Sequence, residues 1–136
     1  MGTWGVDPFG NDDAVDWVYE LEEAEDLGPI EAAIDAVLRA GDDDLEASDA
    51  SVALAASEVL ARLRGQPGEE NSYTETVDQW VASTQLKPTV ELADRAQAAI
   101  ARILADNSEL KELWQEGDEY DAWLASVDDL RIRLGA

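Results

Sequence analysis

The chain has 136 residues, carries 32 acidic side chains against 9 basic ones, and has a formal net charge of −23 at pH 7. It contains neither cysteine nor histidine, which excludes disulfides, thiolate metal sites, cysteine nucleophiles and Ser-His-Asp catalysis. Hydrophobic residues make up 46% of the chain, so the composition predicts one folded acidic domain rather than a disordered acidic tail.

Two helices are predicted after an irregular segment of residues 1–11. Asn11 or Asp12 can cap the first helix, and Gly28-Pro29 separates it from the second, which ends at Gly41. In each helix the apolar residues fall on one stripe that should face the core. These are Ala14, Trp17, Val18, Leu21 and Ala24 in the first helix, and Ile30, Ala33, Ile34, Val37 and Leu38 in the second.

Two further helices are predicted in the middle of the chain. A polar loop, Asp42-Asp43-Asp44, leads to a third helix that begins at Ser48 or Ser51 and stops at residues 65–68. A shorter fourth helix follows. The residues expected to point inward are Val52, Ala56, Val59, Leu60 and Leu63 in the third helix, and Tyr73, Val77, Trp80 and Val81 in the fourth.

The last third of the chain predicts three more helical segments. Lys87-Pro88 starts the first of them, Asp106-Asn107-Ser108 interrupts or re-caps it, and Gly117-Asp118 introduces the last. Their inward residues are Ala93, Ala96, Ile100, Ile103 and Leu104; then Leu110, Leu113 and Trp114; then Tyr120, Trp123, Leu124, Val127, Leu130 and Leu134.

No stretch alternates strictly between apolar and polar residues, so no strand is predicted. Short connections favour antiparallel packing of successive helices. The sequence therefore predicts an all-α fold, a compact single-domain array of six or seven mostly antiparallel helices over residues 1–136. The irregular segment 1–11 is expected to pack on this array.

The start of the chain is similar to a known bacterial family. Residues 2–17 read GTWGVDPFGNDDAVDW, and this stretch resembles the opening of the family named domain of unknown function 4259. The similarity continues into residues 106–110 and 120–123 and covers nearly the whole chain. The resemblance implies a small bacterial protein, and it implies no activity, cofactor or catalytic residue, because the family name carries none.

Location and partners follow from charge and hydropathy. No apolar run approaches the roughly 20 residues that a membrane span needs, and the N-terminus lacks the basic and apolar regions of a signal peptide. A polyanion is repelled by phosphate backbones and anionic lipid, so direct nucleic-acid or membrane binding is not expected. We expect a cytoplasmic monomer without a cofactor.

The irregular N-terminal segment contains two aromatic residues, Trp4 and Phe9, on either side of Pro8. Exposed aromatic side chains often carry much of the energy of a protein interface, so the pair could grip a partner. The alternative is that both rings fold back onto the helices as a plug, as in the hydrophobic staples that precede many helices. The commonness of such staples favours the plug.

Carboxylates gather on one side of the first predicted helix. Asp12, Asp16 and Glu20 stand at i, i+4 and i+8, with Asp13 and Glu23 nearby. This face could be simply solvated, could meet a basic partner, or could bind Mg²⁺ or Ca²⁺ through oxygen ligands alone. Carboxylate metal sites in helical bundles usually also use histidine, which is missing here, so the metal reading is the weakest.

Two other acidic groups resemble sites only in part. Asp42, Asp44 and Glu46 have the 1, 3, 5 spacing of a calcium loop, but Ala47 replaces the glycine at position 6 and Ala53 the glutamate at position 12. A flexible acidic connection accounts better for this stretch. The acids near the C-terminus that could form hydrolytic pairs are expected by chance in so acidic a chain; these are Asp118, Asp121, Asp128 and Asp129.

The charge is uneven, and this unevenness supports the functional prediction. Residues 1–50 hold 16 acids and one base, Arg39, whereas residues 51–136 hold 16 acids and 8 bases. We predict a non-catalytic binding module that captures a basic protein, in the manner of immunity proteins, antitoxins and nucleic-acid mimics. The alternatives are an oxygen-ligand metal-dependent enzyme and an acidic structural domain. The candidate partner-binding residues are Asp12, Asp13, Asp16, Glu20, Glu23, Asp42, Asp43, Asp44, Trp4 and Phe9.

Overall fold

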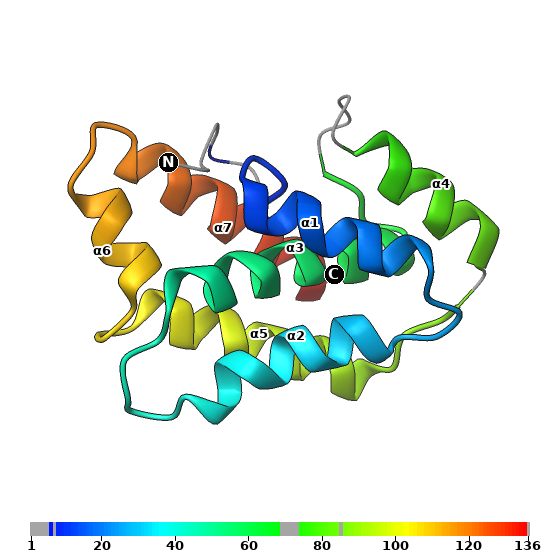
Figure 1. Cartoon of the computed structure of the whole chain (residues 1–136), viewed down its shortest axis with the longest axis horizontal. Helices are drawn as coiled ribbons and strands as arrows, with labels where there is room; N and C mark the ends of the chain where they lie inside the picture. Colours follow the sequence, from blue (N-terminus) through cyan, green and yellow to red (C-terminus); the bar gives the residue numbers. More distant parts are fainter. Residues whose placement is uncertain (1–5, 7, 69–73, 85, 136) are drawn as a thin grey trace.

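The computed structural model, shown in Figure 1, describes residues 6, 8–68, 74–84 and 86–135. Within these residues the chain forms seven α-helices and no strand, which confirms the predicted all-α fold. The helices are α1 (Asp12–Glu22), α2 (Gly28–Arg39), α3 (Ala47–Leu63), α4 (Glu75–Thr84), α5 (Val90–Leu104), α6 (Glu109–Gln115) and α7 (Tyr120–Gly135).

Helix α3 is the centre of the array, and each of the other six helices contacts it. Figure 1 shows α1, α2, α3, α5 and α7 running in alternating directions across the molecule. The sequence predicted one inward stripe on α3, but nearly every side chain from Ala50 to Arg62 is buried. A helix enclosed on all sides needs small residues where its neighbours approach, and α3 supplies them as Ala50, Ala53, Ala55, Ala56, Ser57 and Ala61.

The helix ends follow from specific residues. Asn11 caps α1 by accepting a hydrogen bond from the backbone N–H of Ala14 at 2.8 Å. Thr89 caps α5 in the same way through Leu92, so this helix begins just after Pro88 rather than at it. Gly65 ends α3 with a φ of 81°, a conformation that glycine adopts without steric cost.

The predicted inward faces are largely confirmed by burial, with exceptions at the edges. Leu113 is 45% exposed, so its prediction as a core residue of α6 is wrong. That helix has only seven residues and buries one of them fully, Leu110, because it lies at the edge of the array. Tyr73 falls outside the described residues. No described helix is both long enough and apolar enough to cross a membrane.

Candidate functional site

The acidic face of α1 consists of Asp12, Asp13, Asp16, Glu20 and Glu23, all of them exposed. At 3.6 residues per turn these positions fall within about 100° of arc. The opposite side of the helix carries the buried residues Ala14, Trp17, Val18 and Leu21. The burial of that apolar stripe fixes the orientation of α1, and it holds the five carboxylates toward solvent.

These carboxylates have no ionic partner among the residues that the structure describes. Within the described part of the chain, no residue of α1 takes part in a salt bridge, although six such contacts are formed elsewhere. The arginines of α5 and α7 pair with acids elsewhere: Arg95 with Asp35 on α2, and Arg131 with Asp128 on α7 itself. The hydrogen bond that Arg95 donates to Asp35 raises the pKa of Arg95, which keeps its charge at all ordinary pH values.

An aromatic ring stands next to the acidic face. Tyr19 is 63% exposed and lies one turn from Asp16 and Glu23. A tyrosine ring offers a large contact area and a hydroxyl group at low conformational cost, which is why tyrosine is enriched at interface hot spots. Tyr19 was not among the predicted site residues, although its position off the predicted inward stripe of this helix was a signal that the ring faces solvent.

The loop of Asp42, Asp43 and Asp44 displays its carboxylates on a fixed backbone. Arg102 on α5 donates to the carbonyl oxygens of Gly41 and Asp43, with 2.6 Å from its Nε to Gly41. Asn107 donates to the carbonyl of Asp42 at 3.2 Å. These hydrogen bonds join the backbone of the loop to a distant turn, whereas the sequence predicted a flexible connection.

Further hydrogen bonds join the residues that follow this loop to residues 107–109. Leu45 donates to the carbonyl of Asn107 at 2.8 Å and accepts from the N–H of Glu109 at 3.0 Å. The Glu109 carboxylate then accepts from the N–H of Ala47 at 2.8 Å, at the start of α3. In Figure 1 this loop lies far from α1, across α3, so the fold divides the predicted acidic residues between two surfaces.

The N-terminal aromatic residues do not form the predicted exposed surface. Phe9 is 2% exposed and belongs to the main hydrophobic core, so its prediction as a partner-binding residue is wrong. The alternative prediction, that the ring folds back onto the helices, is the one the structure shows for Phe9. Burial is favoured over exposure because it removes the apolar ring from water. Trp4 lies outside the described residues.

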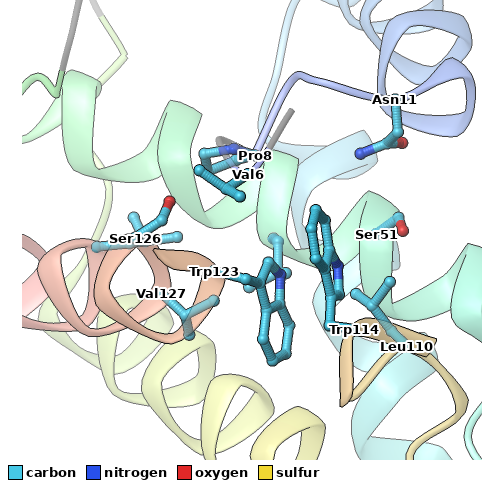
Figure 2. Close-up of a pocket in the computed structure, with 11 residues that line it drawn as sticks. Val6, Pro8, Asn11, Ser51, Leu110, Trp114, Trp123, Ser126 and Val127 are labelled. Atoms are coloured by element: carbon cyan, nitrogen blue, oxygen red, sulfur yellow. The ribbon is translucent and has the colours of Figure 1, made fainter. Parts of the chain in front are cut away.

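Figure 2 shows the part of this segment that meets the C-terminal helices. Val6 and Pro8 lie over the ring of Trp123, which stacks with Trp114 at a centroid distance of 6.0 Å. The gap among these residues has a volume of about 20 Å³, which is room for about one water molecule. It is a packing gap rather than a ligand site.

A buried ionic network, which was not predicted from the sequence, links α3, α4 and α7. Glu58 is 3% exposed and accepts two hydrogen bonds from Arg133, at 2.6 Å and 2.7 Å, and one from Arg62 at 3.2 Å. Arg62 also donates to Asp78 at 2.6 Å, and Arg133 to Asp129 at 2.8 Å. The i, i+4 spacing of Glu58 and Arg62 was visible in the sequence, but the partner 75 residues away was not.

The network has a consequence for titration. The hydrogen bonds that Arg133 donates to Glu58 raise the pKa of Arg133, against the opposing effect of burial. A raised arginine pKa stabilises the folded state at every pH below the ordinary arginine value, and this stabilisation is lost only in strongly alkaline solution. Arg133 therefore contributes no pH dependence near neutrality.

A cleft of about 340 Å³ lies beside this network. Its wall is apolar where Val6, Pro8, Phe9, Ala122 and Ala125 line it. Among the described residues, its polar lining includes Glu58, Arg62, Thr74, Ser126, Asp129 and Arg133. This volume is at the lower end of the range for small-molecule sites.

The residues suggested for metal chemistry do not come together. Among the described residues, no group of three or more acidic side chains has the arrangement that would hold a metal ion. This applies to the acids of α1 and to Asp118, Asp121, Asp128 and Asp129. The metal-dependent alternative therefore has no candidate centre in the described part of the chain.

Comparison with known proteins gives one positive result. The family described as Domain of unknown function (DUF4259) matches residues 2–126, a range that runs from the N-terminal motif through the first part of α7. Comparison with curated proteins and with solved structures gave no match. Because the match covers most of the sequence and includes the motif at residues 2–17, the chain belongs to the DUF4259 family.

Proposed function

We propose that this protein is a non-catalytic binding domain that captures a basic protein through the acidic face of α1. The observation that carries the proposal is the set of five exposed carboxylates without ionic partners in the described structure. Such a surface attracts a basic partner over a distance comparable to the Debye length and accelerates its association.

Charge alone does not select α1, because exposed acids occur on every helix. The difference is whether basic residues lie close enough to neutralise the acids. The stretch 12–26 contains eight acids and no base, whereas α5 and α7 carry arginines that neutralise neighbouring carboxylates. The electrostatic potential should therefore be most negative along α1.

Tyr19 supports contact beyond electrostatic attraction. An aromatic ring with 63% exposure beside a row of carboxylates can pack against the aliphatic part of lysine or arginine while the acids meet the charged ends. The expected partner is a cytoplasmic protein with a basic surface, and one copy of this chain suffices to bind it.

The decisive experiment compares two variants that lose the same charge. D16N/E20Q/E23Q neutralises three carboxylates of the acidic face, and D42N/D43N/D44N neutralises three on the distant loop. Both variants and the unmodified protein are immobilised and exposed to lysate of the source cells at low and high salt. Retained proteins are then identified by mass spectrometry.

The proposal expects one basic protein that the unmodified chain retains at low salt and releases at high salt. The loop variant should retain it, and the α1 variant should lose it. Equal loss in the two variants would show that only total charge matters and would reject the acidic face. Absence of any specifically retained protein would reject the function itself.

Tyr19 allows a second, direct measurement. A photo-reactive phenylalanine analogue placed at position 19 should cross-link to the retained protein. The same analogue at Leu113, which is 45% exposed on α6, is the control and should not. A cross-link from Leu113 alone would place the contact surface elsewhere.

A further inference from the structure

The cleft beside the buried ionic network has the character of a ligand site distinct from the acidic face. It combines an apolar wall, formed by the N-terminal segment and α7, with charged groups from α3 and α7. Its volume of about 340 Å³ equals that of about eleven water molecules in the liquid. That is room for a ligand of roughly ten non-hydrogen atoms.

The charge of the protein decides the sign of the ligand. The charged side chains among the described lining residues are two carboxylates, those of Glu58 and Asp129, and two guanidinium groups, those of Arg62 and Arg133. These four charges balance one another, so the sign of the field is set by the rest of a protein whose net charge is −23. This long-range field favours a cation over an anion.

The hydrogen bonds of Arg133 also favour a cation over an anion. Its Nε donates to Asp129, its Nη1 donates to Glu58 and to the carbonyl of Gln66, and its Nη2 donates to Glu58. An anion would have to displace these contacts in order to reach the guanidinium. A cation leaves them intact.

Asp129 is the group best placed to receive a cation. Its side chain is 65% exposed and lines the cleft, and only its Oδ2 is used by Arg133 in the described structure. Pro8, Ala122 and Ala125 line the same cleft and offer it an accessible apolar surface. We propose that the cleft binds a small organic cation: an amine whose apolar body rests against Pro8, Ala122 and Ala125 and whose charged end meets Asp129.

The test uses three probes of similar size and different charge: phenethylamine, the neutral 2-phenylethanol and the anionic phenylacetate. Each is titrated into ¹⁵N-labelled protein, and amide shifts are followed by NMR. We expect saturable shifts with phenethylamine at residues that line the cleft, such as Phe9, Thr74 and Ser126. The alcohol should bind about threefold or more weakly, as expected for loss of one exposed ionic contact, and phenylacetate should bind weakest.

Two substitutions locate the site. Ala125→Phe places a ring in the cleft from an exposed position of α7 and should abolish the cleft shifts, whereas Ala98→Phe, at an exposed position of α5 outside the cleft, should not. Asp129→Asn should weaken binding about threefold to fivefold. Asp128→Asn removes the same charge from the same helix outside the cleft lining and should leave the affinity unchanged. Circular dichroism confirms that each variant is folded.

Several results would overturn the proposal. Equal affinity for the three probes would show that the charge of the ligand plays no part. Tighter binding of phenylacetate would show that the cleft prefers an anion. Shifts spread over the acidic face of α1 in place of the cleft would indicate general attraction to a polyanion. Unchanged binding in the Ala125→Phe variant would place the ligand elsewhere.

Discussion

The acidic face of α1 and the network around Glu58 use the same kind of side chain in opposite ways. On α1 the carboxylates are exposed and form no salt bridge in the described structure. Glu58 is enclosed and accepts three hydrogen bonds from two arginines. The difference shows that the total charge of −23 has no single role in this molecule.

Solvation explains the contrast. An exposed carboxylate keeps its water shell, so it needs no partner and contributes little to stability. A buried carboxylate loses that shell, and it is tolerated only where cations and hydrogen bonds replace the water. Two of the nine basic residues are used at Glu58, whereas no described salt bridge includes an acid of α1.

The largest effect is expected from removing the buried carboxylate. Glu58→Ala leaves Arg62 and Arg133 without their shared partner in an enclosed region, and it should lower the free energy of unfolding by about 3–5 kcal/mol. Urea denaturation followed by circular dichroism measures the change. A loss below about 1 kcal/mol would mean that water solvates the network, and would contradict the burial seen in the structure.

A double variant separates loss of charge from loss of packing. Glu58→Met with Arg133→Met replaces two side chains that are joined by two hydrogen bonds with apolar side chains of similar length. Because an apolar pair carries no desolvation cost, the double variant should be more stable than Glu58→Ala. A double variant as unstable as the single one would show that the ionic contact itself is required.

A smaller loss is expected at the anchored loop. Arg102→Ala removes hydrogen bonds to the carbonyls of Gly41, Asp43 and Asp106, and should cost about 1–2 kcal/mol because these contacts are exposed. The matched control is Arg131→Ala, which removes an exposed salt bridge within α7 and should cost less than about 0.5 kcal/mol. Hydrogen exchange at Leu45 provides the local measurement, since its N–H bonds to Asn107. Unchanged exchange there would contradict the anchoring role of Arg102.

The helices could be predicted from the sequence because their causes are local. Apolar spacing, the cap at Asn11 and the glycine at position 65 act within a few residues, and the structure confirms each of them. The all-round burial of α3 was not predictable, because it results from six other helices packing on one. Apolar spacing measures the preference of a helix for one face and does not reveal how many neighbours surround it.

The candidate sites were predictable only where one helix holds them. The acidic face of α1 follows from spacing alone, since its residues belong to one helix with a known inward stripe. The pairing of Glu58 with Arg133 and the anchoring of the loop by Arg102 join residues about 60 to 75 positions apart. Such pairs depend on tertiary packing, which a single sequence does not specify.

The smallest effect on stability is expected on α1, and its sign is opposite to the others. Asp16 and Glu20 stand one turn apart, as do Glu20 and Glu23, and each like-charged pair of this kind costs about 0.2–0.5 kcal/mol. D16N/E20Q/E23Q should therefore raise the melting temperature slightly at low salt. Because added salt screens the same repulsion, it should stabilise the unmodified protein more than the variant, and the two melting temperatures should converge as salt increases. Differential scanning calorimetry across a salt series measures this. A variant that melts lower than the unmodified protein at every salt concentration would mean that these carboxylates stabilise α1, and that the acidic face is part of the fold rather than a surface left open for a partner.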